Sequence, residues 1–310
     1  MTLLVATIAI GLVLATLALG SYLSFRVLNM PDVTVDGSLP LGAATAAALI
    51  MSGHDPFVAT AAGFLAGAIA GATTALLHMK LAIDALLAGI LVMTGLYSVN
   101  LRVMGKSNVA LSGEPSVFDP LAGLFERLNG GPRAAIGQWT VGTEDLAALA
   151  TAGIFVVVVT VAIWWLLRTE FGGLLRATGE NQRMVKALGG NVGVTVGIGL
   201  ALSNGLAGLS GALLAQMQGF ADAQMGIGMI VVGLASVIMG LTLVGEASIG
   251  ISLIGVTLGS IIFRLLVALA LRAGLEANDL KLITAVFVLV AIALPKLIGK
   301  GHARGEARRA

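Results

Sequence analysis

The segment at residues 176–189, RATGENQRMVKALG, interrupts a chain of long apolar runs with an unusual density of charge. Its charged side chains are Arg176, Glu180, Arg183 and Lys186. Such charges are costly in hydrocarbon, so the segment must lie in water or against a partner. We expect two short helical pieces, the second with Met184, Val185 and Leu188 on one face. An apolar face beside charged residues suits insertion into a groove on a partner better than it suits an idle linker.

Polar side chains also gather in and just after the apolar run at residues 197–217. They are Ser203, Asn204, Ser210, Gln216, Gln218, Asp222 and Gln224. Polar groups in a helix that crosses hydrocarbon need partners inside the bundle or a wet cavity. The group therefore has two interpretations: it lines a path for a small polar solute, or it only hydrogen-bonds neighbouring helices. For residues 218–224 an outer loop is a third interpretation.

Catalytic and cofactor chemistry is hard to place in this sequence. Cysteine is absent, and the three histidines are scattered without metal-ligand spacing. GKS at 105–107 is no phosphate loop, because Asn100 stands where that motif needs glycine, and GIGMIVVG at 226–233 has the wrong spacing for a dinucleotide fingerprint. Within the apolar runs, Asp84 and Arg264 are the ionisable residues away from the ends, and we expect structural roles for both. We therefore expect no enzyme activity, cofactor, metal or nucleic acid.

The elements that hold these residues follow from composition. Of 310 residues, 57% are apolar and only 11% are charged, whereas soluble domains keep roughly a quarter of their residues charged. Most of the surface must therefore face lipid, and we expect an all-α, polytopic transmembrane bundle that forms one domain over residues 1–310. A spanning helix needs about 20 apolar residues. Such runs lie at 3–23, 57–76, 82–101, 146–168, 197–217, 227–243, 249–271 and 280–297, with a shorter one at 38–52.

A tenth membrane element is possible at residues 24–40, which are polar yet stand between apolar runs. Pro31, Gly37 and Pro40 would break a helix there. Irregular backbone at membrane depth is tolerated only around protein or a water-filled cavity, so a broken element would mark a solute path. Its candidate path residues are Asp36 and Ser38. A plain surface loop is the alternative.

Basic residues predict the orientation of such a chain. The charged segment with its flanks, 169–195, and the tail at 298–310 are both rich in Lys and Arg, so we expect both in the cytoplasm. The loop at 102–145 then lies outside. Nine spans would place the N-terminus outside as well, and ten would place it inside.

Two further patterns predict local structure. Gly63, Gly67 and Gly71 repeat at every fourth residue and predict a close helix contact, as do the pairs Gly193 with Gly197 and Gly255 with Gly259. In the external loop, FDPLAGLFERLNG predicts a short amphipathic helix from residue 119 with Asp119 as its cap. That helix either packs on its own protein or docks a partner outside.

With its flanks, the charged segment resembles the coupling loop of ATP-binding-cassette (ABC) importer permeases of the branched-chain amino acid and ribose type. That loop typically reads Thr-x-Phe-Gly, then Arg-Ala-x-Gly-x-Asn, then Ala-x-x-x-Gly or a close variant. The matching positions are Thr169, Phe171, Gly172, Arg176, Ala177, Gly179, Asn181, Ala187, Leu188 and Gly189. Residues 35–50 are similar to the family's Asp-Leu-Ser-Val-Gly segment, with Asp36 and Gly37 retained and the order altered. QGFADAQMGIG and SVNLRVMGKSNV resemble a branch labelled as amino-acid or tryptophan-type importers.

The resemblance implies a type II importer permease in the lipid of a bacterial inner membrane, with a second permease copy, two cytoplasmic ATPase subunits and an external substrate-binding protein. ATP would be used by the ATPase, and the substrate would be an amino acid or a similar small polar solute. The coupling residues that it implies are Arg176, Ala177, Thr178, Gly179, Glu180, Asn181, Arg183, Lys186 and Gly189. An ion-coupled secondary transporter is the alternative; it would use a helix break at 24–40, although carboxylates within the membrane are nearly missing.

Overall fold

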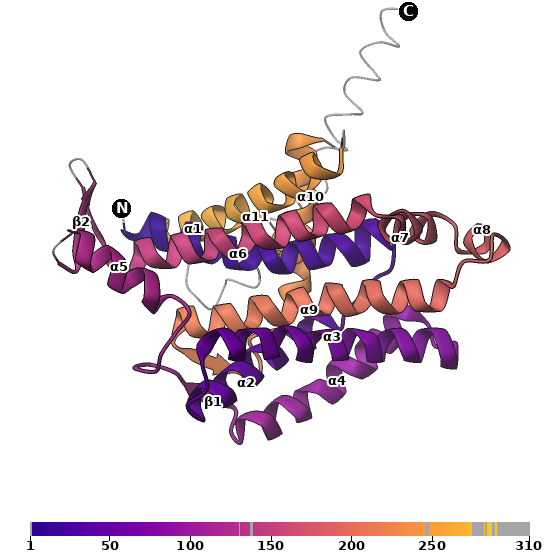
Figure 1. Ribbon diagram of the computed structural model, residues 1–310, viewed down its shortest axis with the longest axis horizontal. Helices are drawn as coiled ribbons and strands as arrows, with labels where there is room; N and C mark the ends of the chain where they lie inside the picture. The colour runs from indigo at the N-terminus through magenta and orange to yellow at the C-terminus, as the bar shows by residue number, and fades with distance from the viewer. Residues whose placement is uncertain are drawn as a thin grey trace, which may run out of the picture.

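The computed structural model describes residues 2–129, 131–136, 139–245, 248–274, 282, 284–286 and 289. It is a helical bundle in which most of the long helices run lengthwise, with short elements at the two ends (Figure 1). Among the described residues, six helices are long and apolar enough to cross a membrane. They are α1 (Thr2–Ser21) with its continuation η1 (Tyr22–Val27), α3 (Pro56–Leu81), α4 (Ala85–Met104), α6 (Thr143–Arg168), α9 (Val192–Gln218) and α11 (Ile249–Arg272). Two shorter apolar helices are α2 (Val35–Met51) and α10 (Met229–Val244).

The all-α polytopic fold predicted from composition is confirmed. Eight of the nine predicted apolar runs are helices, and the short run at 38–52 corresponds to α2. The ninth run, 280–297, lies mostly outside the described residues, and the basic tail at 298–310 lies wholly outside them.

Short elements mark the two ends of the bundle. One end, the α5 end, carries α5 (Asp119–Asn129), the antiparallel pair β2 (Arg133–Ile136) and β3 (Trp139–Gly142), and the antiparallel pair β1 (Asn108–Ala110) and β4 (Phe220–Asp222) (Figure 1). The other end, the α7–α8 end, carries α7 (Glu170–Glu180) and α8 (Gln182–Ala187) (Figure 1). Helix α1 begins at the α5 end (Figure 1). In the described part of the chain, α1 therefore begins at the end opposite to the α7–α8 segment (Figure 1).

The chain between the first two helices is broken but is not a separate crossing. Helix α1 continues into a π-helix, η1, and an irregular stretch follows at residues 28–34, where Asn29 has a φ of 53°. Gly37 and Pro40 do not break the helix as expected, because both lie inside α2. Proline has no N–H to offer the carbonyl one turn earlier. Gly226 packs against that carbonyl, on Asp36, and against the Pro40 ring.

Glycine lets helices approach at backbone distance, as between α3 and α9 and between α10 and α11. Gly63, Gly67 and Gly71 all face α9, where an added Cβ would meet Ala212 or the backbone of Asn204 and Leu200. The predicted contact of this triple is therefore confirmed. Gly255 and Gly259 likewise contact α10 at Gly240. The third predicted pair differs, because a Cβ at Gly197 would meet no described atom within 4 Å.

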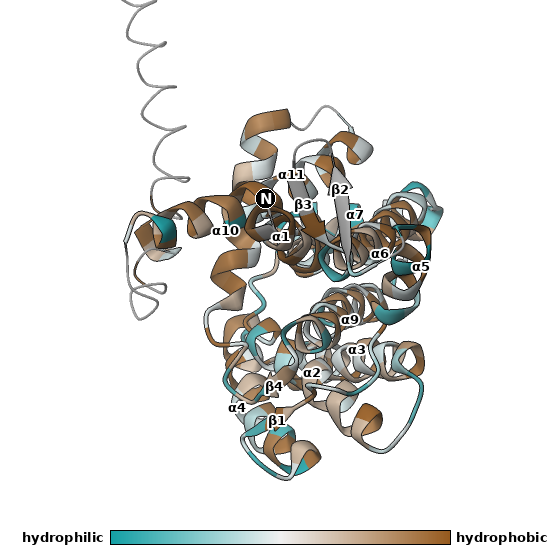
Figure 2. Ribbon diagram, turned by 90° about the vertical axis from the view of Figure 1, so that its left-hand side faces the viewer, coloured by the Kyte–Doolittle hydropathy of each residue, from teal (hydrophilic) through white to brown (hydrophobic). Residues whose placement is uncertain are grey.

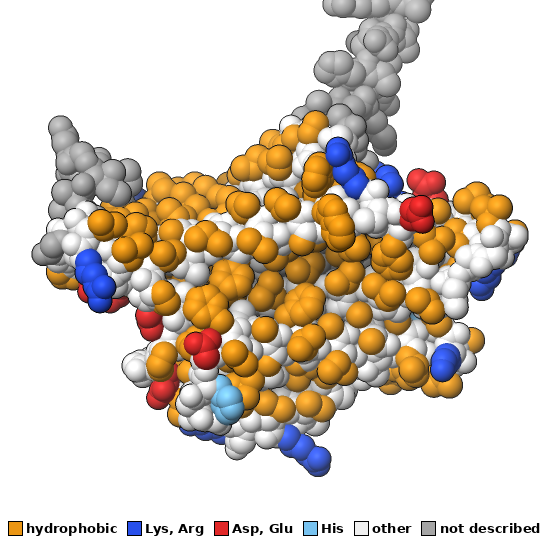
Figure 3. Space-filling model, viewed as in Figure 1, with side chains coloured by type: hydrophobic (Ala, Val, Ile, Leu, Met, Phe, Trp, Pro, Cys, Tyr) orange, Lys and Arg blue, Asp and Glu red, His pale blue; other side chains and the backbone are white. Residues whose placement is uncertain are grey.

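Helix α9 is the most buried of the six spans: 67% of an 18-residue apolar stretch of α9 is buried, whereas in α4 the share is 17%. Seen from the α5 end, α9 lies between the pair α1 and α6 and the pair α2 and α3 (Figure 2). On the face shown in Figure 3, apolar side chains cover the middle and most charged side chains lie toward the ends. The outward faces of α3, α4 and α6 carry exposed Leu, Ile and Val, as a surface in lipid requires.

Candidate functional site: the α7–α8 segment and the buried polar groups

The α7–α8 segment is shaped by two side-chain caps. The Thr169 hydroxyl accepts a hydrogen bond from the Gly172 N–H at 3.2 Å and begins α7. The Asn181 Oδ1 accepts from the Met184 N–H at 3.0 Å and begins α8, while the Asn181 N–H donates back to the Ala177 carbonyl of α7. Asn181 is thus the corner between the two helices. The two short helical pieces expected from the sequence are confirmed.

Glycine and threonine hold α7 against the bundle. Gly179 lies within α7 and makes no turn; an added Cβ would run into the Val27 carbonyl and the Leu28 backbone. Thr178 is fully buried and its hydroxyl donates to the Leu174 carbonyl at 2.7 Å. The turn glycine is instead Gly189, with a φ of 83°.

The outer side of the α7–α8 segment combines charge with two apolar side chains. Met184 is 45% exposed and Leu188 is 80% exposed, whereas Val185 is buried at 2%, so the expectation that all three share one outward face is wrong for Val185. The remaining implied coupling residues that are exposed are Arg176, Glu180, Asn181, Arg183, Lys186 and Gly189, while Ala177 and Gly179 are half-buried. This surface therefore combines two exposed apolar side chains with exposed charged residues at one end of the bundle.

A buried polar network crosses the bundle beside the break. The Asn204 Nδ2 donates to Asp32 Oδ2 at 2.6 Å, and its Oδ1 accepts from the Ser38 hydroxyl at 2.7 Å. Asp32 Oδ1 accepts from the Thr34 N–H at 3.0 Å, and the Thr34 and Thr74 hydroxyls lie 2.7 Å apart. Each of these side chains is at most 2% exposed. The structure thus brings Ser38 and Asn204 together, with Asp32, Thr34 and Thr74, which sequence reasoning missed.

Asp36 has a different partner. Its Oδ2 accepts from the Gly228 N–H at 2.9 Å and its Oδ1 from the Ile230 N–H at 2.7 Å, so a carboxylate on α2 caps the first turn of α10. Such a cap satisfies N–H groups that a helix start leaves without partners, and its charge suits the positive end of the helix dipole. Asp32 and Asp36 are both buried, which corrects the expectation that carboxylates are nearly missing from the membrane region.

The other polar candidates do not converge on one path. Ser203 donates to the Gly20 carbonyl and Ser210 to the Val13 carbonyl, so both bond α9 to α1. Gln218 is exposed at the end of α9, and Asp222 lies in β4, where its Oδ2 accepts from Asn108 at 3.3 Å. The hydrogen bonds of Ser203 and Ser210 thus join two helices, and that of Asp222 joins two strands.

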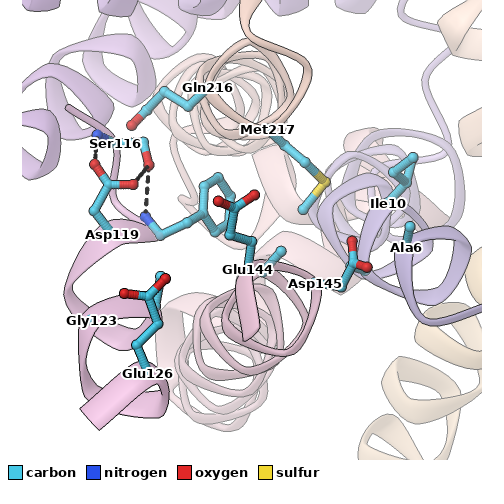
Figure 4. A pocket seen from close by; sticks show the side chains of 14 residues that line it. Ala6, Ile10, Ser116, Asp119, Gly123, Glu126, Glu144, Asp145, Gln216 and Met217 are labelled. Carbon is cyan, nitrogen blue, oxygen red and sulfur yellow. Dashed lines mark hydrogen bonds between the residues drawn. The ribbon is translucent and has the colours of Figure 1, made fainter. Parts of the chain in front are cut away.

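Gln216 lies at a cavity of about 400 Å³ at the α5 end (Figure 4). Its Nε2 donates to the Thr60 hydroxyl at 2.8 Å and its Oε1 accepts from the Val117 N–H at 3.1 Å. The lining includes four carboxylates, Asp119, Glu126, Glu144 and Asp145.

The cavity wall also corrects the predicted cap of α5. The Asp119 carboxylate accepts from the Ser116 N–H and hydroxyl, both at 2.7 Å (Figure 4), and the Ser116 hydroxyl accepts from the Phe118 N–H at 3.3 Å. Ser116 is therefore the capping hydroxyl, and Asp119 reaches back to it, as in a capping box. The amphipathic helix itself is confirmed as α5.

Asp84 is a cap as well, rather than a residue inside a span. Its Oδ1 accepts from the Leu86 N–H at 3.0 Å and the Leu87 N–H at 3.4 Å at the start of α4. Among the described residues, no group of three or more His, Asp or Glu side chains is placed to hold a metal ion.

These features define a class: a polytopic helical membrane protein with a charged segment of two short helices, α7 and α8, at one end. Residues 3–293 match the family described as "Branched-chain amino acid transport system / permease component", and the chain belongs to that family. It is thus an ABC-type transport permease, a multi-pass protein of the bacterial inner membrane and a transport subunit rather than an enzyme.

Known proteins agree with this assignment. The chain is 37% identical over 287 residues to the tyrosine transport system permease protein of Clostridioides difficile, covering 93% of this chain and 89% of that one. It is 26% identical over 235 residues to the autoinducer 2 import system permease protein LsrC of Salmonella paratyphi B, covering 75% and 61%. A solved structure, PsaBC from Streptococcus pneumoniae in complex with Fab, aligns with a TM-score of 0.50 at 14% identity, covering 94% of this chain and 89% of that one, and supports the fold alone.

Proposed function

We propose that this chain is the membrane subunit of an ATP-driven importer and that a separate cytoplasmic ATPase docks on the α7–α8 segment. The observation that carries the proposal is that Met184 and Leu188 are exposed on a segment that also carries exposed charges and that packs on the bundle through Gly179. ATP is hydrolysed on the ATPase, and this chain needs no cofactor. A second copy of the permease completes the solute path, and an external binding protein delivers solute at the α5 end.

The proposed substrate is an amino acid or a similar small polar solute. The relative named for tyrosine transport, at 37% identity, supports an amino acid. The relative named for autoinducer 2 import is less similar, so we place that solute class second.

The test of docking compares two surfaces of one chain. Met184→Ser with Leu188→Ser removes the apolar pair, while Leu128→Ser on α5 removes a side chain that is 72% exposed at the opposite end. We expect the double variant to insert normally but to lose copurification with the ATPase, and Leu128→Ser to retain it. Equal retention in both would refute the docking site.

The test of energy source uses the complex of permease, ATPase and binding protein in proteoliposomes. Uptake should require ATP and the binding protein. Uptake by the permease alone, driven by an ion gradient, would instead establish the secondary transporter.

A further inference from the structure

We propose that the α7–α8 segment acts on the membrane helices through the break at residues 28–34, and that Asp36 is the positioning residue that transmits the movement to α10. The inference rests on the proposed function, because it needs an ATPase that moves α7 and α8. Coupling of this kind requires a contiguous set of contacts and an element with two discrete arrangements. The described residues supply the contacts, and we infer that η1 with the break at residues 28–34 is the element that changes.

The first contact joins α7 to the break. Gly179 packs on the Val27 carbonyl and the Leu28 backbone so closely that no Cβ fits between them. The Leu28 side chain is 2% exposed and lies next to Leu175 of α7 and Gly199 of α9. A displacement of α7 therefore acts directly on the end of η1.

The element with two arrangements is η1 together with the break. A π-helix closes its hydrogen bonds over five residues instead of four, and such segments occur frequently at functional sites. Just after η1, the Leu28 N–H donates to the Leu23 carbonyl, five residues back, and the Met30 N–H donates to the Ser24 carbonyl, both at 2.9 Å. At its start, the Ser21 hydroxyl is buried without a described hydrogen-bond partner and occupies the space beside Gly233 of α10. A change from π to α register would rotate and displace the residues that follow η1, and so move the break relative to α1.

The last contacts lead from the break to α10. The Asp32 carboxylate accepts a hydrogen bond from the Asn204 amide of α9, and Asp32 lies four residues before Asp36. Both oxygens of Asp36 hold backbone N–H groups of the α10 start, at Gly228 and Ile230, and Gly226 packs on the Asp36 carbonyl. Because α2 and the start of α10 are joined by a carboxylate and by a backbone contact, a shift of α2 carries that end of α10 with it.

The experiment compares two carboxylate caps in the assembled complex. Asp36→Asn weakens the cap between α2 and α10, and Asp84→Asn weakens a local cap at the start of α4, outside the proposed route. Because the chain has no cysteine, Ile227→Cys gives one thiol beside the capped turn, at a position that is 50% exposed. Its labelling rate by a permeant maleimide is measured without nucleotide and with ATP plus vanadate.

We expect the labelling rate to differ between the two nucleotide states by about fivefold or more in the Ile227→Cys chain and in its Asp84→Asn form. In the Asp36→Asn form the difference should vanish, with basal ATP hydrolysis retained and less solute imported per ATP. A cap that only stabilises the fold would lower the yield of complex but leave the nucleotide dependence intact. An unchanged dependence in Asp36→Asn overturns the inference.

If Asp36→Asn does not assemble, Asp36→Glu is used, because it keeps the carboxylate on a side chain one methylene longer. In this variant the difference in labelling rate between the two nucleotide states must be smaller than in the unaltered Asp36 chain. An equal difference overturns the inference. Lack of ATP-driven uptake by the unaltered complex would overturn the proposed function, and the inference with it. A coupled, unaltered complex whose Asp36→Asn form behaves like Asp84→Asn would overturn the inference alone.

Discussion

Replacing Gly179 with alanine tests the contact between α7 and the break with a single methyl group. In a helix, alanine is favoured over glycine by roughly 0.5–1 kcal/mol. At Gly179 the new Cβ meets the Val27 carbonyl, and insertion of a methyl into a packed site costs about 1–3 kcal/mol. We therefore expect a net loss of up to ~2 kcal/mol of unfolding free energy, or a displacement of α7 from η1 that relieves the overlap.

Gly173 provides the matched control, because it lies in the same helix and an added Cβ there would meet no described atom within 4 Å. Gly173→Ala should be neutral or slightly stabilising. Both variants are assayed in proteoliposomes for ATP hydrolysis and for solute imported per ATP, with a thermal melt in detergent. We expect Gly179→Ala to import less per ATP than Gly173→Ala. Equal import and equal melting temperatures would refute the claim that α7 bears on η1.

Three further changes test the packing and the caps. Gly71→Ala should lower the melting temperature because its Cβ meets the Leu200 carbonyl, whereas Gly197→Ala should not; equal melting temperatures would contradict the close contact. Asn181→Ala should cost about 1 kcal/mol of α8 stability, visible as faster hydrogen exchange of the α8 amides than in the unaltered chain. Gln216→Leu should cost about 1–3 kcal/mol by leaving the Val117 N–H unpaired, while Gln218→Leu at an exposed site should be neutral in the same unfolding assay.

Hydropathy predicted the spans because each helix that faces lipid must be apolar along its whole length, and that requirement is local in sequence. The contact of Gly63, Gly67 and Gly71 was predictable for the same reason, since three glycines one turn apart fall on one face. Gly197 shows the limit of this argument. Gly197 also follows Gly193 by four residues, but a pair of glycines shows only that another helix could approach that face. It does not show whether a neighbouring helix packs there.

The candidate site was predictable in position but not in partners. The α7–α8 segment stands out through charge, and its helical pieces follow from local pattern. Val185 is buried and Gly179 contacts Val27 because of the way α7 and α8 pack against the bundle. That packing cannot be read from the local sequence pattern. The pair Asp32 and Asn204 is separated by 172 positions, and only the packing of α9 against the break brings the two side chains together.

Buried carboxylates are often taken as a sign of ion coupling, and Asp32 and Asp36 would support that view if they were judged by burial alone. Their geometry argues otherwise. Asp36 uses both oxygens on backbone N–H groups of α10, and Asp32 uses one on the Thr34 N–H and the other on the Asn204 amide. A coupling-ion site needs oxygens that bind and release an ion in each transport cycle. The oxygens of Asp32 and Asp36 instead accept hydrogen bonds that connect the break with α9 and α2 with α10. The same two residues therefore favour mechanical transmission from a docked ATPase over uptake driven by an ion gradient.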